Sequence, residues 1–388
     1  MVGDLFALLP WILSMASLVY YLVGIHAARR FFSMSIEAAG VDRPAVSILI
    51  PLRGVDFRAY ENYASVCRQE YPAFQLVFGV MEPRDSSLAV IRKLKADFPE
   101  TDIELVVDTA TLGSNPKVSN LRNMMRRARH GVLVMLDSDI RIQPDFLTRV
   151  APHAQEPEVG LATCFYRGAG APGVAARIEA VGITAEFAPG VLVAWLTEGM
   201  SFALGAAVAT TREKLAAIGG FEALADYLAD DYMLGQLFRK AGYEVRLLPQ
   251  VVETVLPRVS LAKLLRHQVR WSRGIRACRP GGHAGLVFTH GTVMALANWM
   301  LCGGSLPSTL LLAAVLGVRL WMGWTVGVKH LGDTLLARSF LLLPVRDLFS
   351  FLVWCMSLAG RRVEWRGRSY RIVNGGRIVE DRGVSPVP

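Results

Sequence analysis

Four short apolar runs decide the fold of this chain: AVSILI (45–50), QLVFGV (75–80), IELVV (103–107) and GVLVML (131–136). Helix-like stretches at 58–67, 87–98 and 117–129 separate them. Short, wholly apolar strands that alternate with helices predict a parallel sheet covered on both faces. Such sheets bind ligands at the carboxyl ends of their strands, so the residues after each run are the candidates for a site.

The composition points to a membrane protein. Of the 388 residues 52% are hydrophobic and 19% charged, and 42 Lys+Arg against 33 Asp+Glu give a net charge of +9. Soluble domains are about 45–50% apolar and about 25% charged. High hydrophobicity excludes a disordered protein, and five scattered cysteines without a C-x-x-C pair favour neither a disulfide framework nor a zinc site.

The chain begins with an apolar segment. Residues 5–25 carry no charge and are long enough to cross a hydrocarbon core of about 30 Å. Arg29 and Arg30 follow this segment, which favours an uncleaved anchor (1–30) over a signal peptide and places the next part in the cytoplasm. Residues 45–282 then have the composition of one soluble α/β domain.

A second apolar region spans 285–360. It is broken at Gly303-Gly304 and Pro307, which predicts two helices with a turn between them. The stretch 339–360 contains the charged pair Arg346-Asp347. This stretch is either a span whose ion pair is satisfied inside the bundle or a re-entrant or interfacial segment. The basic tail 361–388 should be cytoplasmic, which requires an even number of crossings after the soluble domain. We expect three spans in total.

Acidic residues follow two of the predicted strands. Asp137 and Asp139 come directly after GVLVML, and two carboxylates on alternate residues can chelate Mg²⁺ or Mn²⁺ on a diphosphate. The alternative is an ordinary loop or helix cap. Glu82 and Asp85 follow the second run.

Two further stretches carry charged residues. After the turn 113–116, Lys117 at a helix start could meet a phosphate or could be a solvated lysine. Asp230 and Asp231 start a helical pattern, and because adjacent carboxylates point to different sides, one can be structural while the other is a general base.

An amphipathic segment, LLRHQVRWSRGIR (264–276), precedes the second apolar region. It gathers His267, Arg270, Trp271, Arg273 and Arg276, and an interfacial helix with snorkelling arginines explains it without a catalytic role. The apolar stretch 187–196 in the middle of the chain is expected to be a buried helix or a wall that guides lipid.

Taken together, these motifs resemble the ceramide glucosyltransferase family (glycosyltransferase family 21), which includes the hopanoid-associated glycosyltransferases of bacteria. The resemblance covers the leading anchor and SILIPLRGVD, GSNPKVSNL, LDSDIRI, LADDYML, HQVRW and VEWRGRSYR. It implies a GT-A fold, a Rossmann-like mixed or parallel sheet, in a cytoplasmic catalytic domain with transmembrane helices at both ends.

The resemblance also implies roles. Glu82 matches the first acidic site, where Asp is usual; Asp137 matches the second, with Asp139 completing the metal motif; Asp231 matches the third, the base. The closing motif departs from the family in its first position, His267, where Gln or Arg is usual. The implied nucleotide-sugar contacts are Glu82, Asp85, Lys117, Asp137, Arg270 and His267, and the implied acceptor wall is Trp271 with Asp230.

The implied reaction is inverting transfer from a UDP-sugar to a primary hydroxyl of a membrane lipid, with Mg²⁺ or Mn²⁺. The stretches ATCFYRG and LLRHQVRWSRGIRA resemble the bacterial hopanoid-associated branch, which implies UDP-N-acetylglucosamine and a hopanoid in a bacterial inner membrane, while UDP-glucose and ceramide are the alternative. A processive polysaccharide synthase and a non-enzymatic membrane protein stay open. Because the basic residues flank the apolar segments, no nucleic-acid partner is expected.

Overall fold

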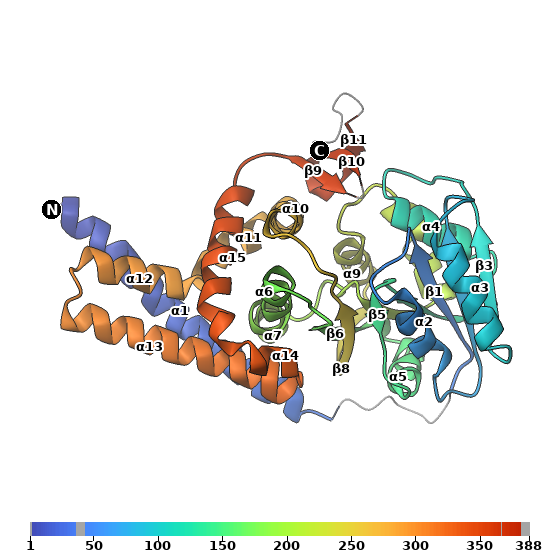
Figure 1. Ribbon diagram of the computed structural model, residues 1–388, viewed down its shortest axis with the longest axis horizontal. Coiled ribbons are helices and arrows are strands. Elements are labelled where there is room, and N and C mark those ends of the chain that lie inside the picture. The colour runs from blue at the N-terminus through green and yellow to red at the C-terminus, as the bar shows by residue number, and fades with distance from the viewer. Residues whose placement is uncertain (1, 36–42, 366, 382–388) are drawn as a thin grey trace.

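The computed structural model describes residues 2–35, 43–365 and 367–381. A large sheet with its covering helices lies on one side, and long apolar helices extend away on the other (Figure 1). A small C-terminal sheet lies above the junction of these two parts.

The first half of the large sheet is parallel, as the four apolar runs predict. The central strand β1 (Val46–Leu52) lies between β2 (Phe74–Val80) and β4 (Val132–Leu136), and β3 (Ile103–Val107) pairs with β2. Every residue of β1 and β4 is buried, which explains why these runs are apolar apart from Ser47.

The second half makes the sheet mixed. Strand β7 (Ala207–Thr211) pairs antiparallel with both β4 and β6 (Val159–Ala169), while β8 (Glu244–Val255) runs parallel to β6 and carries the two-residue β5 (Ile140–Arg141) at the edge. The strand order is β3-β2-β1-β4-β7-β6-β8-β5. The wholly parallel arrangement suggested by the first four runs therefore holds only up to β4.

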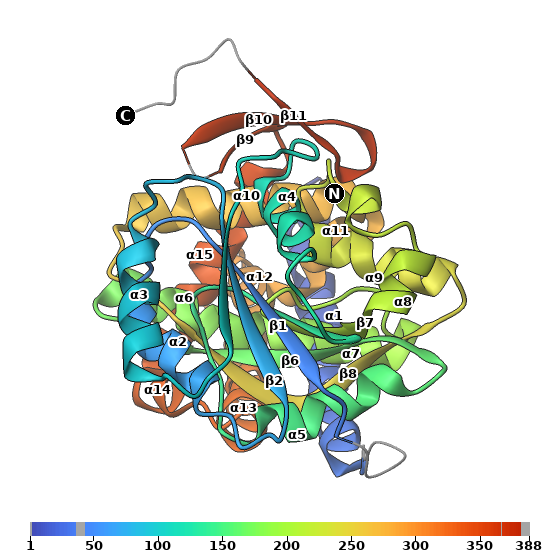
Figure 2. The same ribbon diagram turned by 90° about the vertical axis from the view of Figure 1, so that its right-hand side faces the viewer.

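Short helices cover the sheet (Figure 2). They are α2 (Ala59–Cys67), α3 (Ser87–Asp97), α4 (Pro116–Met124), α5 (Phe146–Val150), α8 (Arg212–Ala217) and α9 (Asp230–Lys240). The helix expected over 117–129 ends at Met124, because Ser47 Oγ and Gln75 Oε1 accept hydrogen bonds from the Arg129 amide (3.1 and 3.0 Å). These strand side chains draw the following backbone out of the helix.

Long helices form the second part. Helices α1 (Val2–Ser33), α12 (Gly291–Leu301) and α13 (Leu306–Gly323) extend together away from the sheet, and α15 (Leu343–Ser357) runs across them (Figure 1). Between them and the sheet lie α6 (Val174–Gly182) and α7 (Ala188–Glu198). The remaining helices are α10 (Leu261–Cys278), α11 (Pro280–Gly285) and α14 (Thr334–Arg338).

Several helices are apolar and long enough to cross a membrane by length and composition. They span Leu8–Ser33, Val174–Glu198, Leu306–His330 and Phe340–Ser357, and the pair Pro280–Thr289 and Gly291–Leu301, bent by 54°, passes the same test as a unit. The expected stretch 187–196 falls in α7, and Ala188, Val191 and Leu192 of this helix are buried.

A buried ion pair joins two of these helices. Arg319 on α13 donates to both oxygens of Asp347 on α15 at 2.7–3.2 Å, and Thr292 on α12 donates to Asp347 at 2.5 Å. Both charged side chains are at most 5% exposed. The Asp of the Arg346-Asp347 pair is therefore matched by a distant arginine, whereas Arg346 pairs with Glu186 of the segment between α6 and α7 (2.7 Å).

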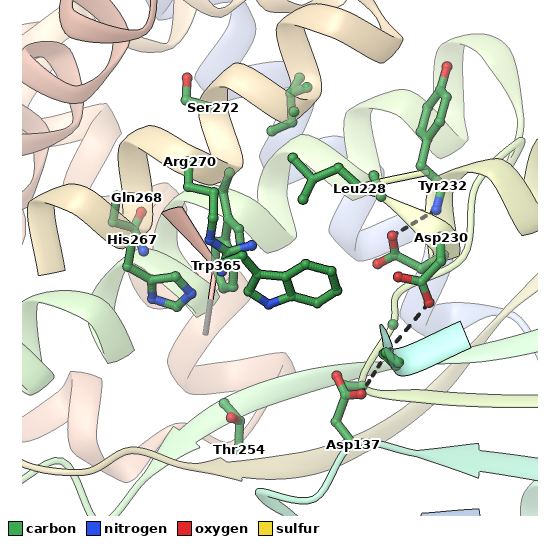
Figure 3. Close-up of a pocket in the computed structure, with 18 of the residues that line it drawn as sticks. Asp137, Leu228, Asp230, Tyr232, Thr254, His267, Gln268, Arg270, Ser272 and Trp365 are labelled. Atoms are coloured by element: carbon green, nitrogen blue, oxygen red, sulfur yellow. Dashed lines mark hydrogen bonds and ion pairs between the residues drawn. The ribbon is translucent and has the colours of Figure 1, made fainter. Parts of the chain in front are cut away.

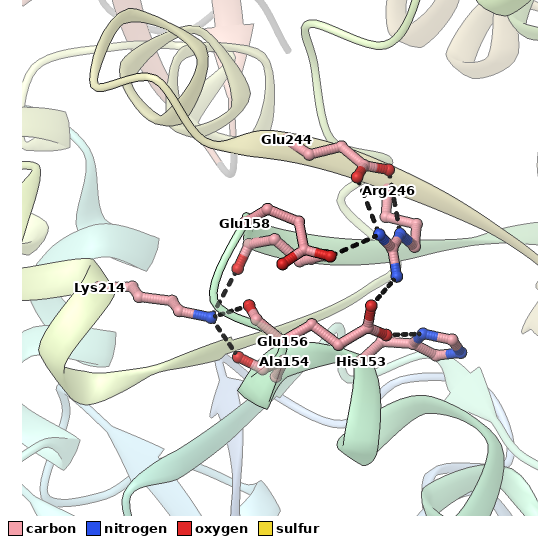
Figure 4. Close-up of polar contacts among 8 residues, drawn as sticks. His153, Ala154, Glu156, Glu158, Lys214, Glu244 and Arg246 are labelled. Atoms are coloured by element: carbon pink, nitrogen blue, oxygen red, sulfur yellow. Dashed lines mark hydrogen bonds and ion pairs between the residues drawn. The ribbon is translucent and has the colours of Figure 1, made fainter. Parts of the chain in front are cut away.

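A second polar cluster lies at the amino ends of β6 and β8 (Figure 4). The ammonium of Lys214 donates to the carbonyls of Ala154, Glu156 and Val159 at 2.6–2.7 Å. Glu156 also accepts from Arg246 and contacts the His153 ring (2.5 and 2.8 Å). These contacts hold the start of β6 in place. The cluster therefore has a structural role.

The basic segment after 361 is folded in its described part. Strands β9 (Arg362–Trp365), β10 (Arg368–Ile372) and β11 (Ile378–Glu380) form an antiparallel sheet in the order β11-β10-β9. Its apolar face packs on Leu228. The sequence predicts a basic tail over 361–388 but does not predict these strands. Residues 382–388 lie outside the described residues.

Candidate active site

One large cavity of about 1810 Å³ opens at the carboxyl ends of the parallel strands. Its polar end is lined by Asp137, Asp139, Lys117 and Asp231. Its other end is lined by apolar and polar residues of the long helices, among them Tyr20, Phe187, Val191, Leu286, His290, Val353 and Trp354. The cavity thus connects the strand ends to the helices that could enter a membrane.

The N-terminus of α4 places Lys117 in this cavity. Asn115 caps the helix by accepting from the amides of Lys117 and Val118 (2.9 and 3.1 Å). The Lys117 ammonium lies 2.6 Å from Asp137 Oδ1 and 3.7 Å from Asp230 Oδ2. Burial lowers the pKa of Lys117, but these carboxylates outweigh it and hold the pKa above its ordinary value. Lys117 is therefore not the solvated lysine of the simpler interpretation.

Asp139 lies deeper beside Asp137. Its Oδ2 accepts from Thr254 Oγ1 on β8 at 2.8 Å. Burial and the neighbouring charge of Asp137 raise the pKa of Asp139 to about 7. A buried carboxylate beside a second carboxylate is stabilised by an added cation.

The donor set fits a metal shared with a ligand. Within 2–35, 43–365 and 367–381, no three His, Cys, Asp or Glu side chains converge on one point that could hold an ion. Asp137 and Asp139 supply only two carboxylates, and Mg²⁺ binds in this way, through one or two carboxylates together with phosphate oxygens and water. The residues therefore fit Mg²⁺ or Mn²⁺ that arrives with a diphosphate.

Asp231 lies in the first turn of α9, where the sequence predicts a helix start. Its Oδ1 accepts from the amide of Tyr232 at 2.8 Å. Burial and the adjacent charge of Asp230 raise the pKa of Asp231 to about 6, which suits a general base near neutral pH. Gly205 packs against it, since a Cβ there would lie 2.6 Å from Asp231 Oδ2.

Asp230 contacts residues at the start of helix α4. Asn115 Nδ2 donates to Asp230 Oδ1 (3.3 Å) and to the Tyr227 carbonyl (2.8 Å), and the Ser114 amide donates to Asp226 Oδ1 (2.8 Å). The two loops 113–116 and 225–230 are therefore joined. As the sequence suggests for adjacent carboxylates, Asp230 is held by structural contacts while Asp231 lies against Gly205.

The two acidic residues after β2 differ. Asp85 is buried and accepts from the amides of Gly54 and Ser87 and from Ser87 Oγ, at 2.6–3.1 Å. Burial raises the pKa of Asp85, but these hydrogen bonds outweigh it and the net shift is downward. Asp85 thus fixes the turn after β1. Glu82 is exposed, and both residues line the cavity.

Helix α10 carries the closing motif. Arg270 lines the cavity (Figure 3). Trp271 also lines it and is 41% exposed. His267 Nδ1 lies 3.2 Å from Glu179 Oε1 on α6, and its ring packs on Trp271 with centroids 4.4 Å apart. Arg273 instead donates to the carbonyls of Ala359 and Arg362 (3.1 and 2.7 Å).

Arg276 behaves like Arg273 and donates to the carbonyls of Leu358 and Gly360. The two arginines that the sequence assigns to snorkelling thus hold the link to the C-terminal sheet. Sequence reasoning missed several cavity residues: Asn115, Tyr166, Glu179, Gly205, Thr254 and Trp365. Asn115 had a signal, because Asn directly before Pro is a strong helix cap. Trp365 lies in the stretch VEWRGRSYR of the resemblance, but that stretch did not place it at the cavity, because only the tertiary fold brings it here.

A mixed sheet with carboxylates at its central strand ends and a further carboxylate at the start of a following helix defines a GT-A glycosyltransferase. A solved structure agrees with this fold: the mannosyltransferase PcManGT from Pyrobaculum calidifontis, in complex with GDP-Man and Mn²⁺, is 18% identical, covers 89% of this chain and 98% of its own, and has a TM-score of 0.56.

The family profile described as Glycosyl transferase family 21 matches residues 9–378, so the chain belongs to glycosyltransferase family 21. Ceramide glucosyltransferase 1 of Caenorhabditis elegans is 24% identical over 360 residues, 89% of this chain and 75% of the relative. Ceramide glucosyltransferase 3 of the same organism is 24% identical over 344 residues, 87% and 74% of the two chains. The resemblance drawn from the motifs is confirmed at the level of the family.

Proposed function

We propose that this glycosyltransferase moves a sugar from a UDP-sugar to a primary hydroxyl of a membrane lipid. The continuity of the cavity carries this proposal, because the same space is bounded by Asp137 and Asp231 at the strand ends and by Val191 and Val353 on the apolar helices. A charged donor and an apolar acceptor need such a site. The names of the curated relatives also support a lipid acceptor.

In the proposed reaction, Asp231 accepts the proton of the lipid hydroxyl as its oxygen attacks the anomeric carbon. The bond from that carbon to the diphosphate breaks, and UDP leaves with the electron pair, which inverts the configuration in one displacement. Lys117 and Arg270 balance the charge that develops on the leaving UDP. Asp137 and Asp139 would hold a divalent metal, which supplies further charge neutralisation when bound.

The roles of the remaining residues follow from their contacts. We propose that Asp85 shapes the nucleotide site through the Gly54 turn and that the exposed Glu82 contacts the nucleotide. His267 pairs with Glu179 and packs on Trp271. We therefore propose that His267 contributes to the acceptor side of the cavity and does not bind a phosphate directly.

We propose that α1, the bent α11–α12 pair and α13 cross the membrane and that α15 lies across them at its surface. The C-terminal sheet packs on Leu228 of the catalytic domain. Both must then lie on one side of the bilayer, which requires an even number of crossings between them. Arg29 and Arg30 favour the cytoplasm of a bacterial inner membrane for that side.

Two donor and acceptor pairs fit the proposal. The motifs favour UDP-N-acetylglucosamine and a hydroxylated hopanoid, and the names of the relatives favour UDP-glucose and ceramide. Purified protein in lipid nanodiscs, given each labelled UDP-sugar with each acceptor, should form a single lipid glycoside by mass spectrometry, and Asp231→Asn should not. A ladder of polymer would instead identify a processive synthase, and no product with any pair or with lipids extracted from the source cells would refute the proposal.

A further inference from the structure

The C-terminal sheet is fastened to the catalytic domain on two sides. The Leu228 amide donates to the Gly376 carbonyl (3.1 Å), and the Ile378 amide donates to the Asp226 carbonyl (2.7 Å). On the other side, Arg273 binds the carbonyls of Ala359 and Arg362. The sheet therefore holds a fixed position relative to the loop 225–230, which leads directly into Asp231.

Close packing reinforces these bonds. Val363, Tyr370, Ile372 and Ile378 bury an apolar face against Leu228. Gly376 approaches Cys278 of α10 so closely that an added Cβ would overlap its sulfur atom. A segment that merely trailed in solvent would have neither contact.

All three strands of this sheet contribute residues to the cavity lining. Glu364, Trp365, Gly367, Arg368, Tyr370, Val379 and Glu380 belong to its lining. Figure 3 shows the indole of Trp365 pointing into the space between Arg270 on one side and Asp230 and Asp137 on the other. The Trp365 and Tyr370 rings lie 6.2 Å apart, which supports the indole from the strand behind it.

We infer that Trp365 binds the transferred sugar ring of the donor. This inference rests on the proposed function. With the diphosphate at Asp137 and Lys117 and the attacking hydroxyl at Asp231, the sugar must occupy the space that Trp365 faces. A flat, largely apolar indole matches the C–H face of a pyranose, and the polar edge of the sugar is left for Asp230 and Arg270.

The same contact protects the reaction from water. Asp231 would remove a proton from water as readily as from a lipid hydroxyl, which would release free sugar and UDP in place of lipid glycoside and UDP. Trp365 covers the sugar from the side of the C-terminal sheet and so limits the access of water to the anomeric carbon.

Binding of UDP and of UDP-sugars to the full-length protein tests this inference without requiring transfer. Titration calorimetry should show that Trp365→Ala weakens UDP-glucose or UDP-N-acetylglucosamine by about tenfold and changes UDP by less than about twofold, since only the sugar loses its stacking partner. Trp365→Phe should restore most of the affinity. Arg371→Ala is the matched control, because Arg371 lies exposed on the neighbouring strand and outside the cavity lining.

A second measurement follows product. In nanodiscs with the acceptor that the wild type uses, Trp365→Ala should raise the ratio of donor hydrolysis to lipid transfer severalfold, and Arg371→Ala should not. Equal losses of UDP and UDP-sugar affinity, or unchanged affinity for both, would overturn the role of Trp365. Wild-type protein that binds neither UDP nor a UDP-sugar would instead refute the proposed function itself.

Discussion

Lys117 and Asp137 form a close ion pair, with the ammonium 2.6 Å from the carboxylate, at the point where helix α4 meets the end of strand β4. The same ammonium lies 3.7 Å from Asp230 on α9. One cation therefore bridges the proposed metal-binding strand and the helix of the proposed base, so the site is organised around a positive charge before any donor enters.

Loss of that charge should weaken donor binding. We expect Lys117→Gln to reduce the affinity for UDP by about 10–100-fold, the usual range for a hydrogen bond to a charged group. Calorimetry with UDP measures it. Lys93→Gln is the control, because that lysine is exposed on α3 and pairs with Asp97. An unchanged affinity in Lys117→Gln would show that the lysine only steadies the empty site.

The pH dependence of transfer should reflect Asp231. Its pKa is raised to about 6, and the base acts only when deprotonated, so the rate should rise with pH through about 6 and level off above it. Asp230→Asn removes a neighbouring negative charge and should move this rise to lower pH. Initial rates of the wild type and of Asp230→Asn, measured from pH 4.5 to 8.5 (a range of about four units around the pKa), test this shift. Identical pH profiles of the two proteins would contradict it.

Gly205 should be required for the position of the base. Because a Cβ at this position would lie 2.6 Å from Asp231 Oδ2, Gly205→Ala should displace the carboxylate and lower kcat by about 100-fold. UDP affinity and the melting temperature should stay near the wild-type values. Gly131→Ala is the matched control, since its Cβ would meet no atom within 4 Å; a fully active Gly205→Ala would show that Asp231 tolerates displacement.

Removal of divalent metal should abolish transfer. Asp137 and Asp139 are two carboxylates with burial and mutual repulsion at the strand end, so EDTA should stop product formation and Mg²⁺ or Mn²⁺ should restore it. Direct binding of Mn²⁺ in the presence of UDP, followed by its electron paramagnetic resonance signal, should be lost in Asp139→Asn. Full activity in chelator would remove the metal role of this pair.

The buried pair Arg319–Asp347 should matter for stability more than for chemistry. Arg319→Ala leaves Asp347 buried without its main partner and should destabilise the protein by about 3–5 kcal/mol. The melting temperature in detergent reports the change. The double variant Arg319→Met with Asp347→Leu, which removes both charges, should recover most of the loss; a double variant as unstable as the single one would show that the apolar replacements do not fit.

The sequence predicts the first half of the fold well because the runs that form β1, β2 and β4 are almost wholly buried, and because the edge run that forms β3 pairs with β2, the preceding strand in the sequence. It does not predict β7. This strand, AVATT, reverses the direction of the sheet beside β4, and its pairing depends on the path through α6 and α7, which local pattern does not encode.

The site was predictable where a residue follows a strand or starts a helix. Asp137, Asp139, Lys117 and Asp231 all do so, and the structure brings them together. The contacts of Arg273 were not predictable, because the amphipathic pattern of α10 does not distinguish it from its neighbours and the resemblance assigns a role to Arg270 alone. The fold supplies the explanation, since it places the carbonyls of Ala359 and Arg362 against Arg273.

The position of the C-terminal sheet also sets an order of events during synthesis. Ile378 and Gly376, which bond to Asp226 and Leu228 beside Asp231, leave the ribosome after every strand of the large sheet and after helices α10 to α15. The strand ends that carry Asp137 and Asp139 can therefore fold before the part of the cavity wall that Trp365 lines has been synthesised. The cavity is consequently completed by a segment that joins the large sheet only after the apolar helices have been made.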